Sequence, residues 1–82
     1  MYKIVFTQRA IRDFKTIDKH IQKQLLNKVE WFSREPLKYA RKLISPTIGD
    51  YRFRIGDYRV VFDIEGENIV ILRIGHRKDI YR

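Results

Sequence analysis

Apolar and charged residues alternate along the last third of the chain. Residues 51–55 read Tyr-Arg-Phe-Arg-Ile, the dipeptide Gly56-Asp57 follows, and residues 58–64 resume the alternation. A period of two residues is typical of a half-buried strand, and a short loop containing glycine is typical of a β-hairpin. This loop would set Arg54 directly opposite Arg59. Because like charges opposed across a ladder destabilise it, the pair indicates a surface that binds an anion.

A second hairpin is predicted to share the strand at residues 58–64. A three-residue loop over residues 66–68 matches the apolar faces of its two arms, with Ile64 opposite Val70, Phe62 opposite Leu72, Val60 opposite Ile74 and Arg59 opposite Gly75. This register also brings Arg77 close to the turn at Asp57. A two-residue loop would instead turn Arg73 toward the helices, so the three-residue loop is the prediction.

The first half of the chain has helical spacing after one short strand. Residues 2–6 alternate as a strand, Thr7 can cap a first helix, and Asp18 can cap a longer one. Pro36 is expected to end the longer helix, and residues 37–50 form a basic, partly irregular connection. The longer helix has an apolar stripe formed by Ile21, Leu25, Leu26, Val29 and Phe32.

The expected order is therefore β-α-α-β-β-β. This is an α+β fold, in which an N-terminal strand and a helical hairpin are followed by antiparallel strands and the helices pack on one face of the sheet. No internal repeat, linker or low-complexity stretch divides residues 1–82, so one domain is expected. The basic side chains are expected on the face away from the helices.

Charge narrows the class of partner. The chain of 82 residues has 18 Lys and Arg against 10 Asp and Glu, a formal net charge of +8. Such a balance favours polyanions such as nucleic acid, ribosomes, acidic proteins or anionic membrane, and charge alone does not choose among them. The chain has no cysteine and no apolar run of the ~20 residues that a membrane span needs. A soluble, cytoplasmic protein without a membrane partner is expected.

Six residues form the candidate site. Arginine is planar, permanently charged and able to hold phosphate oxygens bidentately, so a cluster of arginines can bind RNA and stabilise charge at a reacting phosphorus. Cleavage by the 2′-hydroxyl of RNA also needs a base and an acid, and neighbouring cations favour the proton-accepting forms of imidazole and phenol. The candidates are Arg52, Arg54, Arg59 and Arg77 together with His76 and Tyr81.

The C-terminal tail adds two further cations, Lys78 and Arg82, as candidate phosphate ligands. The acidic residues are scattered at turns and helix ends, and neither paired carboxylates nor a His/Asp cluster is visible. Any nuclease activity is therefore expected to need no metal or other cofactor.

Structural interpretations compete with these functional ones. His76 can tether backbone at a strand end, the ring of Tyr81 can pack on the sheet, and Arg73 can pair diagonally with Asp63 on the same face. Trp31 is more typical of core and helix packing than of a base-stacking surface. The basic residues at the start of the connection, Lys38, Arg41 and Lys42, are more typical of a solvated loop than of a nucleic-acid contact.

Three segments together resemble a known family. They are the N-terminal Tyr-Lys-Ile-Val-Phe, residues 51–62 (Tyr-Arg-Phe-Arg-Ile-Gly-Asp-Tyr-Arg-Val-Val-Phe) and residues 75–82 (Gly-His-Arg-Lys-Asp-Ile-Tyr-Arg). The chain resembles RelE-type toxins of the RelE/ParE toxin–antitoxin superfamily along its whole length. By position, the resemblance implies a basic pair at Arg52 and Arg54, a phosphate-stabilising arginine at Arg59, a second catalytic arginine at Arg77 and the terminal tyrosine at Tyr81.

The resemblance also implies an activity and partners. A RelE-type toxin enters the ribosomal A site and cuts the mRNA codon there by 2′-hydroxyl attack. A RelB-type antitoxin neutralises it, and the two together bind operator DNA. Two alternatives stay open: a ParE-like inhibitor of DNA gyrase without nuclease activity, and a non-catalytic RNA-binding module.

Overall fold

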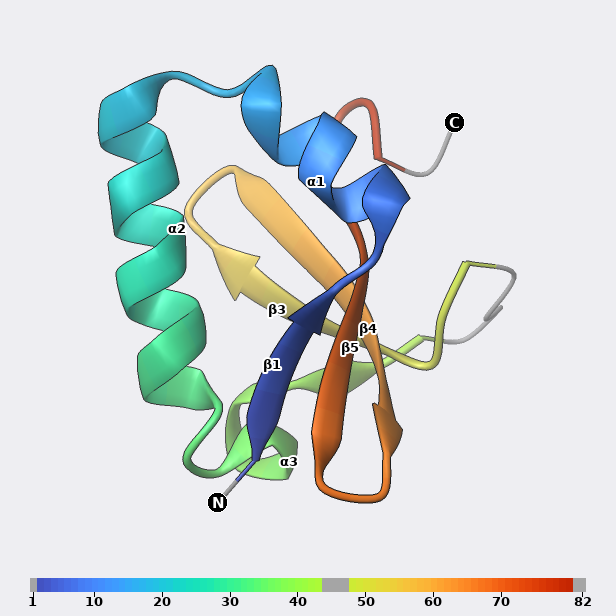
Figure 1. The fold of residues 1–82 in the computed structure, drawn as a ribbon. Coiled ribbons are helices and arrows are strands. Elements are labelled where there is room, and N and C mark those ends of the chain that lie inside the picture. Colours follow the sequence, from blue (N-terminus) through green and yellow to red (C-terminus); the bar gives the residue numbers. More distant parts are fainter. Residues whose placement is uncertain (1, 44–47, 81–82) are drawn as a thin grey trace.

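The computed structural model describes residues 2–43 and 48–80. Figure 1 shows the helices and strands in chain order. They are β1 (Lys3–Phe6), α1 (Gln8–Lys15), α2 (Lys19–Phe32), α3 (Pro36–Tyr39), β2 (Arg41–Lys42), β3 (Tyr51–Ile55), β4 (Tyr58–Glu65) and β5 (Asn68–His76). The predicted α+β fold is confirmed. The short elements α3 and β2 lie in the connection that was expected to be partly irregular.

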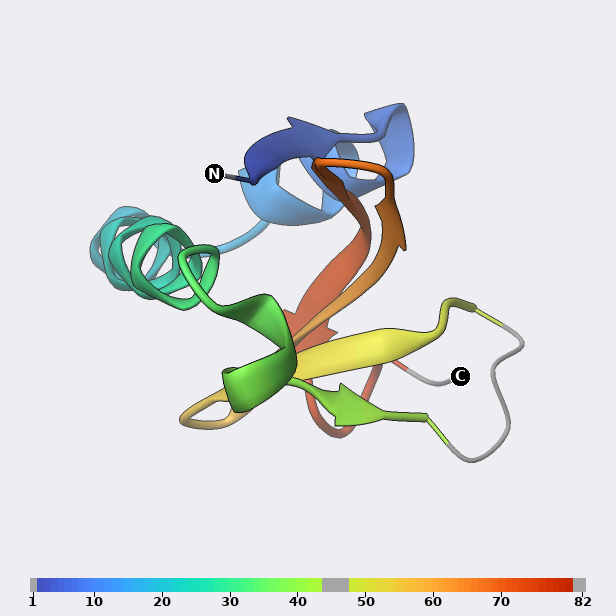
Figure 2. The ribbon, with the colours of Figure 1, turned by 90° about the horizontal axis from the view of Figure 1, so that it is seen from below.

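All the strands belong to one mixed sheet with the order β1-β5-β4-β3-β2. β1 runs parallel to β5, whereas the other neighbours are antiparallel. The two longer helices cover one side of this sheet, as Figures 1 and 2 show together. Neither α1 nor α2 therefore covers the opposite face of β3 and β4.

The hairpin of β3 and β4 has the predicted register. Arg54 lies opposite Arg59, Phe53 opposite Val60 and Ile55 opposite Tyr58. Gly56 has a φ of 58°, and a positive φ at the first position of a two-residue loop is the type II′ geometry that suits the twist of a hairpin.

The loop predicted for the second hairpin is wrong in length. Glu65 pairs with Asn68, so two residues rather than three form the loop, and Phe62 lies opposite Ile71 instead of Leu72. An irregularity at Val61 and Phe62 then shifts the register. Beyond it the predicted pairs are present, with Val60 opposite Ile74 and Arg59 opposite Gly75. A β-bulge inserts one extra residue in one strand. It explains why the pairs next to the loop differ from the prediction by one residue while the pairs beyond the bulge agree with it.

Helix starts follow the predicted caps. The hydroxyl of Thr7 accepts a hydrogen bond from the backbone N–H of Ala10 at 3.1 Å, which satisfies one of the free donors at the start of α1. Asp18 occupies the N-cap of α2, although its side chain makes no capping hydrogen bond. α2 ends at Phe32, and Pro36 begins α3, where its missing N–H is harmless.

The main core lies between the helices and the sheet. Leu25 and Val29 of α2 are buried with Phe53 and Phe62, whose ring centroids are 4.3 Å apart. The predicted packing role of Trp31 is wrong, because this residue is 51% exposed and lies beside the guanidinium of Arg34. Leu26, a member of the predicted apolar stripe of α2, is 42% exposed, so the stripe is narrower than its spacing suggested.

A smaller apolar contact lies on the face opposite the helices. Val61 is fully buried there, and Gly49, just before β3, lies against it. A Cβ added at Gly49 would be 2.9 Å from Cγ1 of Val61 and 2.6 Å from Cδ1 of Leu72. Only a residue without a side chain fits this close approach.

We therefore expect Gly49→Ala to lower the free energy of unfolding by about 1–3 kcal/mol, the usual cost of overpacking. Gly75→Ala is the control, because its added Cβ would meet Ile80 at an ordinary contact distance of 3.6 Å. Urea denaturation of both variants measures the difference. If the two variants had the same free energy of unfolding, the segment at Gly49 would be able to shift and accept a Cβ without loss of stability.

Candidate functional site

The arginines of β3 and β4 lie on the face away from the helices. Phe53 and Val60 point into the main core, and side chains alternate between the two faces of a strand. Arg52, Arg54 and Arg59 therefore share the opposite face. Arg54 is exposed and Arg52 is partly exposed. The structure thus brings together three of the four predicted arginines.

A fourth cation joins this face from β2. Arg41 pairs directly with Arg52, so both side chains leave the sheet on the same side. We call Arg41, Arg52, Arg54 and Arg59 the basic face. Like charges are directly opposed twice on it, once between β2 and β3 and once between β3 and β4. From the sequence, Arg41 was expected in a solvated loop, because a strand of two residues shows no alternation.

Arg59 differs from its neighbours on the basic face because it is only 6% exposed. Its Nη1 donates to the carbonyl oxygens of Gly56 at 2.9 Å and Tyr58 at 2.8 Å. The guanidinium therefore braces the turn between β3 and β4. Its charge is fixed below the surface, whereas Arg54 opposite it reaches solvent.

Arg77 follows the end of β5 and contacts the same turn, as predicted. Its backbone N–H donates to the carbonyl oxygen of Asp57 at 2.7 Å, and its Nε lies 3.5 Å from Oδ1 of Asp57. The side chain of Arg77 remains 56% exposed. An ion pair this exposed is worth little and leaves the guanidinium able to exchange Asp57 for another anion.

The tail forms a tight turn after His76. The N–H groups of Asp79 and Ile80 both donate to the carbonyl oxygen of His76, and Ile80 is buried against Gly75. Lys78 is exposed on this turn. The predicted site residues Tyr81 and Arg82 lie outside the described residues.

His76 lies on the other side of the sheet from the basic face. It pairs with Tyr58, which belongs to the helix-facing set of β4, and the two rings meet edge to face at 5.6 Å. Its Nδ1 accepts the backbone N–H of Lys78 at 3.2 Å. The tethering interpretation of His76 is confirmed, and the predicted convergence of His76 with the arginines is not found.

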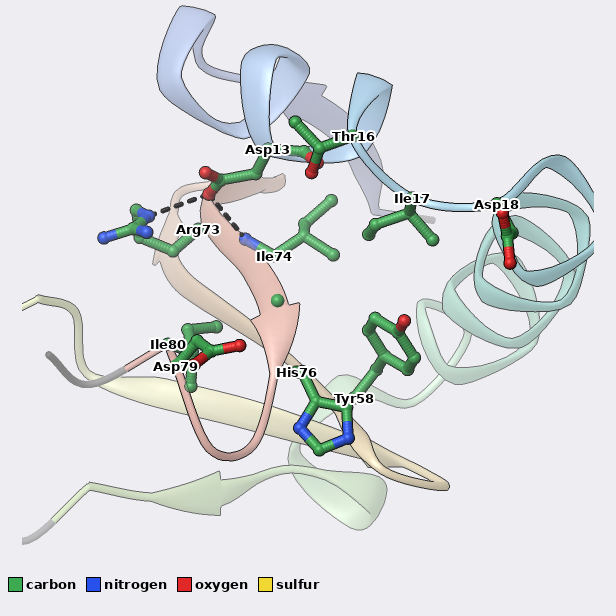
Figure 3. A pocket seen from close by; sticks show the side chains of 11 residues that line it. Asp13, Thr16, Ile17, Asp18, Tyr58, Arg73, Ile74, His76, Asp79 and Ile80 are labelled. Carbon is green, nitrogen blue, oxygen red and sulfur yellow. Dashed lines mark hydrogen bonds and ion pairs between the residues drawn. The ribbon is translucent and has the colours of Figure 1, made fainter.

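A polar pocket lies beside His76, between the end of α1 and the tail (Figure 3). Its walls are formed by Asp13, Thr16, Ile17, Asp18, Tyr58, Arg73, Ile74, Gly75, His76, Asp79 and Ile80. Three carboxylates, those of Asp13, Asp18 and Asp79, line this pocket together with one arginine, Arg73. The basic face, in contrast, is formed by arginines. The pocket thus differs from the basic face in the kind of charged side chain that lines it.

Asp13 fixes the exposed edge of β5 in this pocket. Its Oδ2 accepts from Nε of Arg73 at 2.7 Å and from the backbone N–H of Ile74 at 3.0 Å. The predicted pair of Arg73 with Asp63 is thus wrong, and Oδ1 of Asp63 accepts the N–H of Asp50. The bulge and the position of α1 cause the difference, and neither was visible in the sequence.

In the part of the chain that the structure describes, no group of three or more His, Cys, Asp or Glu side chains could hold a metal ion. Across the same residues, no helix has the length and apolar character needed to cross a bilayer.

Comparison with known proteins identifies the family. A family model described as the ParE toxin of type II toxin–antitoxin systems, parDE, matches residues 4–81. The chain is 38% identical to toxin RelG of Mycobacterium tuberculosis over 87 residues, covering 99% of this chain and 97% of RelG. It is 32% identical to toxin RelE3 of Methanocaldococcus jannaschii over 83 residues, covering 96% and 94% of the two chains.

A solved structure agrees with the sequence relatives. The toxin–antitoxin complex RelBE2 of Mycobacterium tuberculosis contains a chain that superposes with a TM-score of 0.83 at 32% identity, covering 93% of this chain and 98% of that one. The protein therefore belongs to the RelE/ParE superfamily of toxins from type II toxin–antitoxin systems.

We expect Asp13→Ala to lower the free energy of unfolding by about 2 kcal/mol, because it removes a charged acceptor shared by two donors. The side chains of Asp13 and Arg73 are only 14% and 21% exposed, so water replaces their contact poorly. Arg9→Ala is the control, since Arg9 is 57% exposed and 3.7 Å from Asp13, and its loss should change stability by less than about 0.5 kcal/mol. Thermal denaturation measures both, and similar losses would contradict a special role for the edge contact.

Proposed function

We propose that this toxin is a metal-independent endoribonuclease that cleaves messenger RNA in the ribosomal A site, in the cytoplasm. The observation that carries the proposal is the basic face, where arginines are opposed across two neighbouring strand pairs. Such opposition costs free energy in the absence of an anion and favours binding of a phosphate backbone. The similarity to the toxins RelG and RelE3 supports the same conclusion.

The proposed chemistry is transesterification. The 2′-hydroxyl oxygen attacks the adjacent phosphorus, the bond from phosphorus to the 5′-oxygen breaks, and the products are a 2′,3′-cyclic phosphate and a 5′-hydroxyl. One proton leaves the 2′-hydroxyl, and one is delivered to the 5′-oxygen. Negative charge grows on the non-bridging oxygens, and guanidinium groups stabilise it without a metal.

Each arginine has a different part in this proposal. Arg54 and Arg77 are exposed and can donate directly to phosphate oxygens. Arg59 is buried against the turn that also contacts Arg77, so it contributes a fixed positive charge and positions its neighbours. A charge held in a low-dielectric site acts more strongly than one in water. Arg52 is partly exposed and Lys78 is exposed, and both are proposed as further phosphate ligands. Arg82 is proposed for the same role, although it lies outside the described residues.

Proton transfer needs groups other than arginine, which is effectively always protonated. Nδ1 of His76 already accepts the backbone N–H of Lys78, and the ring lies on the other side of the sheet from the basic face, so His76 is poorly placed to act as the base. We assign proton transfer to Tyr81 and to groups of the ribosome. An acid–base set that is incomplete on the toxin explains why cleavage would depend on the ribosome.

The proposed partner is a RelB-type antitoxin. The chain superposes on a toxin–antitoxin complex, RelBE2, which supports a protein partner of the same kind. An acidic or amphipathic antitoxin would cover the basic face or displace the C-terminal turn. Together the two proteins would bind operator DNA.

The decisive experiment is cleavage of ribosome-bound mRNA. We expect Arg54→Gln and Arg77→Gln each to slow cleavage by about 10²-fold, because each removes a donor to the charge that develops at phosphorus. Arg12→Gln is the matched control, since Arg12 is an exposed cation on α1 and its loss should leave the rate unchanged. Equal rates for the wild type and all three variants would show that neither Arg54 nor Arg77 contributes to cleavage.

A second candidate is a ParE-like inhibitor of DNA gyrase, and the description of the matching family model favours it. Primer extension on mRNA from cells that express the toxin separates the two functions. Cuts in phase with codons support the endoribonuclease. DNA damage with intact mRNA supports the gyrase inhibitor.

A further inference from the structure

The strand β2 orients two neighbouring cations in opposite directions. Arg41 pairs with Arg52 and Lys42 pairs with Tyr51. The ring of Tyr51 stacks on Phe62 at 5.7 Å and packs against the main core, so Tyr51 faces the helices. Lys42 therefore lies on the helix side of the sheet, and Arg41 lies on the basic face.

Arg41 extends the basic face to the edge of the sheet. β2 is the last strand in the order, and neighbouring strands lie about 4.8 Å apart. The cations thus follow a path across the strands, from Arg59 and Arg54 between β4 and β3 to Arg52 and Arg41 between β3 and β2. Arg41 is exposed, and none of the ion pairs between described residues includes it.

We propose that Arg41 is a distal phosphate-binding residue for single-stranded RNA. It would contact a phosphate outside the bond that is cleaved, so that the RNA backbone crosses the strands and leaves the protein at β2. This inference rests on the proposed function, because it takes the RNA held near Arg54 as its starting point. Duplex DNA is the competing polyanion.

The position predicts the kinetic role. Arg41 is separated from Arg77, at the end of β5, by the intervening strands β3 and β4. A contact remote from the reacting phosphorus is made equally in the ground state and the transition state, so it lowers KM without changing kcat. Arg54 and Arg77 would instead affect kcat.

The first test is the salt dependence of binding to a single-stranded oligouridylate, measured with the wild type, Arg41→Gln and Lys42→Gln. Each phosphate contact contributes about 0.7 to the slope of log affinity against log salt for a single strand. We expect Arg41→Gln to make the slope less steep by about 0.7. Lys42→Gln removes the same charge from the adjacent residue, on the other face, and should leave the slope unchanged.

Equal changes in the two variants would show a general effect of net charge and overturn the assignment, as would an unchanged slope for Arg41→Gln. A duplex DNA of equal length is the second probe. If the difference between the variants occurs with the duplex and not with the single strand, the site belongs to DNA and the RNA assignment fails.

The second test is cleavage of ribosome-bound mRNA by the same three proteins. Arg41→Gln is expected to raise KM with an unchanged kcat, and Lys42→Gln to match the wild type. Loss of kcat in Arg41→Gln would contradict a distal role. Failure of the proposed function looks different, because the wild type itself would then not cleave, while the difference in salt slope would still decide whether Arg41 binds RNA.

Discussion

The two-residue turn at Gly56-Asp57 is the constraint on which the basic face depends. Its positive φ at Gly56 closes the hairpin of β3 and β4 with a fixed register. Because side chains alternate along a strand, a slip by one residue would move Arg54 to the helix side and expose Phe53. The fully buried ring of Phe53 opposes such a slip. The main core and the basic face are thus two consequences of one register.

The same turn chemistry explains what could and could not be predicted for the second hairpin. Gly66 has a φ of 60°, close to the 58° of Gly56, and is also the first residue of a two-residue loop. The glycine position was a signal for the shorter loop. The three-residue loop was predicted by matching the apolar faces of the two strands. That matching assumes a regular ladder, so it did not allow for a bulge. The pairs beyond the bulge, such as Arg59 with Gly75, were nevertheless correct.

The burial of individual side chains and their tertiary contacts were harder to predict from the sequence than the strand register. Alternation assigned Arg59 to the correct face, but its burial depends on bonds to the carbonyl groups of Gly56 and Tyr58. The side chain of His76 points to the helix side, which the pairing with Tyr58 decides. The sequence contained this information. The predicted pair of Arg59 with Gly75 implies that the next pair is Tyr58 with His76, and Tyr58 belongs to the apolar set of residues 58–64. Arg41 lies in a strand of two residues, too short for any period to be read.

The basic face connects stability with function through repulsion. In the free protein, Arg54 and Arg59 are opposed at a site where one charge is buried and cannot move away. Opposed like charges destabilise a strand ladder, and in the proposed function a phosphate between the two side chains would offset this cost. Part of the binding free energy would then come from relief of a cost already present in the fold. A neutral residue at position 54 would suit the isolated hairpin better, and the proposed binding of a phosphate would account for the arginine there.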